Sequence, residues 1–170
     1  MRNFTKLFAL AIAMIGLSSA SYAQEDATAT ASATIITPIS ITKAVDMNFG
    51  NVAVQSTTAG TVVLATDNGR TKTGGVTLPT FATGTIAAAS FTVEGEADYT
   101  YAITLPTSVT IVSGLNDMVV DTFTSSPSAT GVLTLGTETL KVGATLNVDA
   151  AQPAGLYTNT TDLTVTVNYN

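Results

Sequence analysis

Short runs of alternating apolar and polar residues recur along this chain, with turn residues between them. The clearest runs are residues 86–93, 99–105, 139–148 and 163–169. Successive side chains of a strand point to opposite faces, so a period of two predicts strands that each bury one face. No convincing helical stretch follows residue 23. We therefore expect an all-β fold, an antiparallel β-sandwich or barrel of about 8–10 short strands.

Turn residues predict how some of these strands connect. Asp67-Asn68-Gly69 is a strong hairpin signal after a strand at residues 61–66. Residues 94–98 predict a tight loop joining residues 86–93 and 99–105 into a hairpin. Residues 133–135 predict a further short strand.

The N-terminal 23 residues are typical of a signal peptide. Arg2 and Lys6 precede an apolar core at residues 7–17, and Ser21-Tyr22-Ala23 predicts cleavage after Ala23. The apolar core is too short for a spanning helix of about 20 residues, so we expect no direct membrane insertion. The protein is expected in the periplasm in transit and then at the cell surface or outside the cell. The predicted organisation is a signal peptide (1–23), an N-terminal extension (24–36) and one sandwich domain (37–170).

The composition narrows the possible functions. The chain has a formal net charge of −6 and no histidine, cysteine or tryptophan. A basic patch for phosphates is missing, which argues against nucleic-acid partners. Without histidine or cysteine the common nucleophile systems and ordinary zinc sites are excluded. We expect a non-enzymatic protein with no catalytic residues, no cofactor and no metal site.

Three local motifs leave alternatives open. The acidic cluster Glu94, Glu96 and Asp98 is interpreted as a solvated turn, with a weak Ca²⁺ site as the alternative. Lys141 is the one plausible lysine for a Lys–Asn crosslink, but no partner is indicated. Asn159-Thr160-Thr161 matches a glycosylation sequon and is interpreted as a chance match.

The chain has a tyrosine, Tyr169, in the penultimate position and a glycine, Gly155, upstream of the last strand. With these two residues the C-terminus resembles the signature of pilin subunits exported by the chaperone–usher route and of spore-coat-U-like domains. It implies a periplasmic chaperone that grips the last strand, and an outer-membrane usher, as partners.

Five short motifs stand out in the interior: Pro38-Ile39-Ser40-Ile41, Asp46-Met47-Asn48-Phe49-Gly50, Phe91-Thr92-Val93-Glu94-Gly95, Leu140-Lys141-Val142-Gly143-Ala144-Thr145-Leu146 and Ala154-Gly155-Leu156-Tyr157. With these motifs the interior resembles a pilin-like bacterial family of unknown function (DUF4402-type). The resemblance covers nearly the whole chain after residue 23.

The pilin comparison implies an Ig-like, pilin-like antiparallel β-sandwich and assembly by strand donation between like subunits. A domain that lacks its final strand would leave a groove, and the extension of the next subunit would fill it. The expected donor residues alternate along the extension: Ala27, Ala29, Ala31, Ala33 and Ile35. The expected groove residues lie on the last strand: Leu163, Val165, Val167 and Tyr169.

Two alternatives to this hypothesis stay open. The extension can instead be a loose tail or a strand paired with its own domain, which would leave a complete monomeric sandwich. Such a monomer would act as a secreted or periplasmic binding module for carbohydrate or another surface ligand. Binding modules of this kind usually present aromatic platforms, whereas Tyr99, Tyr101 and Tyr157 fit core positions better.

Overall fold

A computed structural model describes residues 24–159 and 163–170, and the chain divides into two compact units, Met1–Thr34 and Ile35–Asn170. The expected signal peptide (1–23) lies outside the described residues. In the first unit, residues 24–34 are exposed and belong to no helix or strand. Among the described residues no helix is long and apolar enough to cross a membrane.

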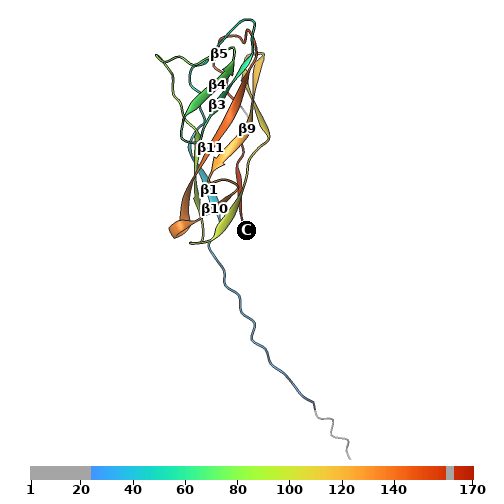
Figure 1. Cartoon of the computed structure of the whole chain (residues 1–170). Coiled ribbons are helices and arrows are strands. Elements are labelled where there is room, and N and C mark those ends of the chain that lie inside the picture. Colours follow the sequence, from blue (N-terminus) through green and yellow to red (C-terminus); the bar gives the residue numbers. More distant parts are fainter. Residues whose placement is uncertain (1–23, 160–162) are drawn as a thin grey trace, which may run out of the picture. The chain divides into compact units, whose positions relative to one another are not determined.

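The second unit is built on a seven-stranded antiparallel sheet (Figure 1). Its path runs β1-β6-β11-β3-β4, and β9 joins β11 to β8. The strands are β1 (Ser40–Val45), β3 (Gly60–Leu64), β4 (Arg70–Gly74), β6 (Ala89–Glu94), β8 (Ser108–Ser113), β9 (Asn116–Ser126) and β11 (Thr137–Val148).

β11 is the central strand of this sheet. On one edge it pairs with β9, and on the other it pairs first with β6 and then with β3. The register shows the change of partner: Leu140 lies opposite Phe91 of β6, and Leu146 lies opposite Val62 of β3. β6 and β3 therefore follow one another along the same edge of β11.

The second layer consists of two separate small sheets. One has the order β10-β7-β12, with β10 at Thr130–Val132, β7 at Thr100–Thr104 and β12 at Thr166–Tyr169. The other pairs β2 (Ala53–Val54) with β5 (Val76–Thr77). The expected all-β antiparallel sandwich is confirmed.

The predicted turn at Asp67-Asn68-Gly69 is confirmed, because it joins β3 to β4 and Asn68 has a φ of 72°. The predicted hairpin around residues 94–98 is wrong. β6 pairs on both edges with strands of the large sheet, β1 and β11, so it has no edge left for β7. Residues 94–98 instead carry the chain from one layer to the other.

The strand predicted at residues 133–135 is also wrong. A short 3₁₀ turn, η1 (Thr134–Gly136), occupies most of this segment. Leu135 has a positive φ of 55°, which is incompatible with extended pairing.

The core divides into two clusters along β11. The first joins Leu140 and Val142 of β11 to the β7 residue Tyr101 and to Val165 and Val167 at the C-terminal strand. The second contains Ala144, Leu146 and Val148, packed with Val62, Val76 and Val120. The first half of β11 is thus covered by a strand layer, and the second half is covered mainly by loops.

We expect Leu140→Ala to lower the free energy of unfolding by about 2–5 kcal/mol, because it opens a cavity at a fully buried position. Leu135→Ala is the matched control at an exposed position and should change stability by less than about 0.5 kcal/mol. Urea unfolding of both variants measures the difference. Equal effects would contradict the assigned core.

Candidate functional site

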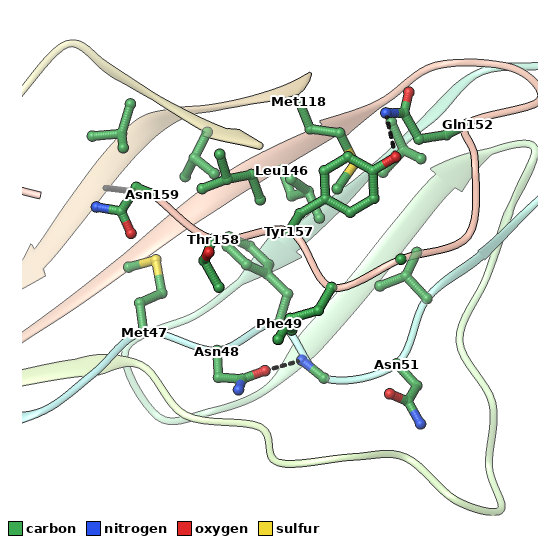
Figure 2. Close-up of a pocket in the computed structure, with 18 of the residues that line it drawn as sticks. Met47, Asn48, Phe49, Asn51, Met118, Leu146, Gln152, Tyr157, Thr158 and Asn159 are labelled. Carbon is green, nitrogen blue, oxygen red and sulfur yellow. Dashed lines mark hydrogen bonds between the residues drawn. The ribbon is translucent and has the colours of Figure 1, made fainter. Parts of the chain in front are cut away.

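A cavity of about 720 Å³ lies over the second half of β11. Its floor is the inner face of the large sheet, formed by Ile111, Met118, Val120, Leu146 and Val148. Figure 2 shows Met118 and Leu146 among the side chains that line it. No described lining residue has a charged side chain.

One wall of the cavity is the segment 47–54, which follows β1. The Arg70 guanidinium donates to the backbone carbonyls of Phe49 and Asn51. Asn48 exchanges backbone hydrogen bonds with Ala87, at 2.7 and 2.9 Å. These hydrogen bonds attach the wall to β4 and to the segment that precedes β6. None of them involves the opposite wall of the cavity.

The opposite wall is the segment 152–159. Thr158 and Val112 exchange backbone hydrogen bonds of 3.0 and 2.9 Å, which tie this wall to β8. The Gln152 side chain donates to the Asp117 carbonyl and to the Tyr157 hydroxyl, and the second of these bonds is drawn in Figure 2. Tyr157 in turn donates to the carbonyl of Pro153 at 2.8 Å. This wall is therefore braced against β8 and β9.

The second layer is interrupted between these walls. Among the described residues, β12 is hydrogen-bonded to β7 alone and β2 to β5 alone, so each has a strand edge without a ladder. A backbone bond from Ala151 to the carbonyl of Gln55, 2.9 Å long, joins the two sides just beyond the cavity. The site is an uncharged slot with an apolar floor, polar side chains in both walls and strand edges nearby.

The four predicted groove residues do not lie together on this cavity. Leu163 lines it, whereas Val165 and Val167 are buried in the first core cluster of their own domain. Tyr169 lies at the far end of β12, packed against that cluster. Their alternation indicates an inward face correctly, but that face already packs against the rest of the sandwich.

The sequence pattern does not identify the segments that form the walls as site residues. In residues 152–159, Pro153 and Gly155 interrupt the alternation, which by itself indicates only a turn. This interruption is the sequence feature that could have indicated the cavity. Where the alternation stops, a strand ends, and the part of the facing sheet beyond it has no strand to cover it.

The penultimate Tyr169 closes a ring of hydrogen bonds at the other end of the domain. Its hydroxyl accepts the Glu96 backbone N–H at 2.6 Å and donates to the Thr37 carbonyl at 2.7 Å. The Glu96 carboxylate accepts the Thr37 N–H at 2.8 Å. Gly95 lies against the Tyr169 hydroxyl, and a Cβ at this position would collide with that hydroxyl. We call these contacts the Thr37 latch.

The Thr37 latch assigns a role to one member of the acidic cluster. Hydrogen bonds from the Thr37 backbone N–H, and then from its hydroxyl, lower the pKa of Glu96. The described residues contain no group of three or more acidic, histidine or cysteine side chains placed to hold a metal ion. Glu94, Glu96 and Asp98 therefore do not form such a group.

The tyrosines differ in their surroundings. Tyr101 is fully buried, and burial together with the adjacent Glu138 carboxylate raises the pKa of its phenol. Glu138 accepts hydrogen bonds from the Tyr101 hydroxyl and the Val132 N–H, which joins β11 to β7 and β10. Tyr157 lines the cavity, and Tyr99 is partly exposed and packs edge-on against Tyr169. Of the three tyrosines expected in the core, Tyr101 alone is fully buried.

These features define an all-β sandwich domain whose second layer is interrupted over an uncharged cavity. The sequence profile of a family described as Domain of unknown function (DUF4402) matches residues 39–169. The chain belongs to this family. No curated protein and no solved structure matches it.

We expect the amide signal of Thr37 to titrate with a midpoint below 4.5, the ordinary value for glutamate. The lowered pKa of Glu96 means that the latch stabilises the fold above that value and loses this contribution as the pH falls through the lowered pKa. NMR spectra recorded between about pH 2 and 7 measure the midpoint. Glu96→Gln should abolish the titration, and Glu94→Gln should keep it. A midpoint at or above 4.5 would contradict the assignment.

Proposed function

We propose that this protein is a non-enzymatic structural subunit of a bacterial surface fibre or coat. The extension of one copy adds as a strand to the next copy, in the slot between residues 47–54 and 152–159. The observation that carries the proposal is the interrupted second layer, with its apolar floor and strand edges. Strand addition supplies the backbone hydrogen bonds that such edges lack.

The extension has the chemistry of a strand that fits this slot. Ala27, Ala29, Ala31 and Ala33 would face the floor, and the intervening threonines and serine would face solvent. The described residues 24–34 are exposed and outside any strand of their own unit, which makes their backbone groups available. Glu25 and Asp26 precede this part of the extension, and residues 27–36 carry no charged side chain, which suits a site whose described lining carries no charge.

Entry of the donor has to pass the backbone bond between Ala151 and Gln55. Breaking one such bond costs about 0.5–1.5 kcal/mol net. A ladder of several new backbone bonds offsets this, so the bond is a small barrier to strand addition.

Export and chaperoning complete the proposal. The subunit would pass through the periplasm after cleavage behind Ala23, and a chaperone would hold the β12 edge until an usher and a like subunit replace it. The pilin-like resemblance of Gly155 and Tyr169 supports these partners. No cofactor is needed, because the assembly reaction makes only noncovalent contacts.

A binding module is the second candidate, and the rim of the cavity favours it. Asn48, Asn51, Gln152 and Thr158 place amide and hydroxyl groups around an apolar slot (Figure 2). Its volume lies in the range of small-ligand pockets, about 300–1,000 Å³. Saturable binding of an oligosaccharide by the monomer, abolished by Gln152→Ala, would support this function.

We expect protein that begins at Gln24 to run as a heat-sensitive ladder on an unboiled SDS gel. Deleting residues 24–36 should remove the ladder. Ala29→Asp and Ala31→Asp should weaken assembly at least about 100-fold, because an ion buried in an apolar slot costs several kcal/mol. Thr30→Asp is the matched control on the solvent face of the same strand and should keep the ladder.

Folding of each variant is checked by circular dichroism and urea unfolding. A single monomer band for folded wild-type protein at every concentration would contradict the proposal. Equal losses for Ala29→Asp and Thr30→Asp would contradict the assigned inward face.

A further inference from the structure

The end of the domain that holds the Thr37 latch exposes two large apolar side chains. Ile35 is 97% exposed and lies two residues before Thr37. Leu135 is 89% exposed and belongs to η1, whose Gly136 carbonyl accepts the Gly95 N–H. The segment 95–96 thus contacts both the Thr37 region and η1, so both side chains belong to this end. We call it the latch end.

The opposite end of the domain carries a second such pair. Leu115, at the tip of the β8–β9 hairpin, is fully exposed, and Leu156, at the rim of the cavity, is 82% exposed. Gly155 lies directly against Ser113, and Thr158 pairs with Val112, so both leucines are near the same hairpin. We call this the hairpin end.

β11 separates the two ends. It begins at Thr137, directly after η1, and ends at Val148, near the hairpin tip that follows Ser113. A strand of 12 residues is about 40 Å long. Because the two ends are this far apart within one copy, a contact between a latch end and a hairpin end must join two copies.

The length of the linker decides how two copies would meet. If residues 27–33 occupy the slot of one copy, only residues 34–36 remain before Thr37, which is fixed in its own domain by the latch. Three extended residues span about 10 Å. The latch end of the donor copy must then lie against the hairpin end of the acceptor copy.

We propose that successive copies of this chain contact each other end to end, with Ile35 and Leu135 of one copy packed against Leu115 and Leu156 of the next. The inference rests on the proposed function. The two surfaces differ, so the contact is heterologous and propagates as an open filament. Ile35 then belongs to the junction between copies and leaves the donor set.

The direction of the donor follows from the same geometry. β7 begins at the latch end and runs away from it. Tyr169 pairs with Tyr101 and Thr166 with Thr104, so β12 is antiparallel to β7 and runs toward the latch end. A donor strand that exits at the hairpin end runs the opposite way. It therefore lies antiparallel to β12.

Charge at the two ends gives the contact a recognisable salt dependence. Glu94 and Asp98 lie at the latch end, and Asp117 and Asp149 lie at the hairpin end. These like charges oppose the contact, and salt screens exposed charges. Assembly should therefore strengthen as NaCl rises from about 20 to about 300 mM, the reverse of a contact based on opposite charges.

The test uses the absence of cysteine from this chain. A variant that carries both Leu135→Cys and Leu115→Cys should form disulfide-linked ladders under mild oxidation. Each single variant should give dimers at most. Val45→Cys with Leu135→Cys is the matched control, because Val45 is 44% exposed and lies at neither end: it pairs with Ser90, which pairs with Lys141 in the middle of β11.

A second measurement does not depend on crosslinking. Leu135→Ser and Leu115→Ser should each raise the protein concentration for half-maximal assembly about tenfold. Val45→Ser should leave it unchanged, and light scattering across a dilution series measures all three.

The outcomes separate this inference from the proposed function. In one outcome, wild-type protein polymerises, the double-cysteine variant forms no crosslink between positions 115 and 135, and the serine variants assemble like wild type. This outcome overturns the end-to-end contact but leaves strand donation unaffected. Wild-type protein that stays monomeric overturns both. Ladders together with weakened serine variants support both.

Discussion

The length of β11 is the constraint on which the rest of this structure depends. Its 12 residues present an inner face about 40 Å long, and that whole face is apolar from Leu140 to Val148. The facing strands β7 and β12 have five and four residues and cover only the half nearest Thr137. The cavity follows from this mismatch, because the other half is covered only by the two-residue strands β2 and β5 and by irregular chain.

The proposed assembly uses the same mismatch. Its described lining carries no charged side chain, and the Thr37 latch, which fixes the start of the domain, lies at the other end of β11. Polar groups are thus used to fix where the chain enters the domain, and apolar groups are used to present a surface. A latch at one end and a slot toward the other give the domain a direction, which is what a linear polymer requires.

Local patterns in the sequence predict the class of the fold and several strands, because alternation and turn residues such as Asn68 and Gly69 act over a few residues. They do not predict partners. The strand at residues 86–93 is followed by a loop typical of a hairpin, yet both edges of β6 are occupied by β1 and β11. The inward face of the last strand is likewise visible in Val165 and Val167, but whether that face meets its own core or an empty slot depends on the facing layer. The cavity lies where no described strand of the facing layer longer than two residues covers the large sheet. No local sequence pattern indicates that a longer facing strand is absent.

The small side chains of the extension bear on how a polymer of this kind would be held. Burying four alanine methyl groups contributes about 3 kcal/mol at roughly 0.8 kcal/mol each, which is modest beside a ladder of backbone hydrogen bonds. Large apolar residues at the ends would each add about 1.5–3 kcal/mol, and the three-residue linker would hold them at high effective concentration once the strand is in place. Strand and end contact are therefore coupled: neither is strong alone, and each raises the occupancy of the other. In the proposed polymer, such coupling would let a donor of alanine and threonine stay extended before assembly and would make the completed junction far more stable.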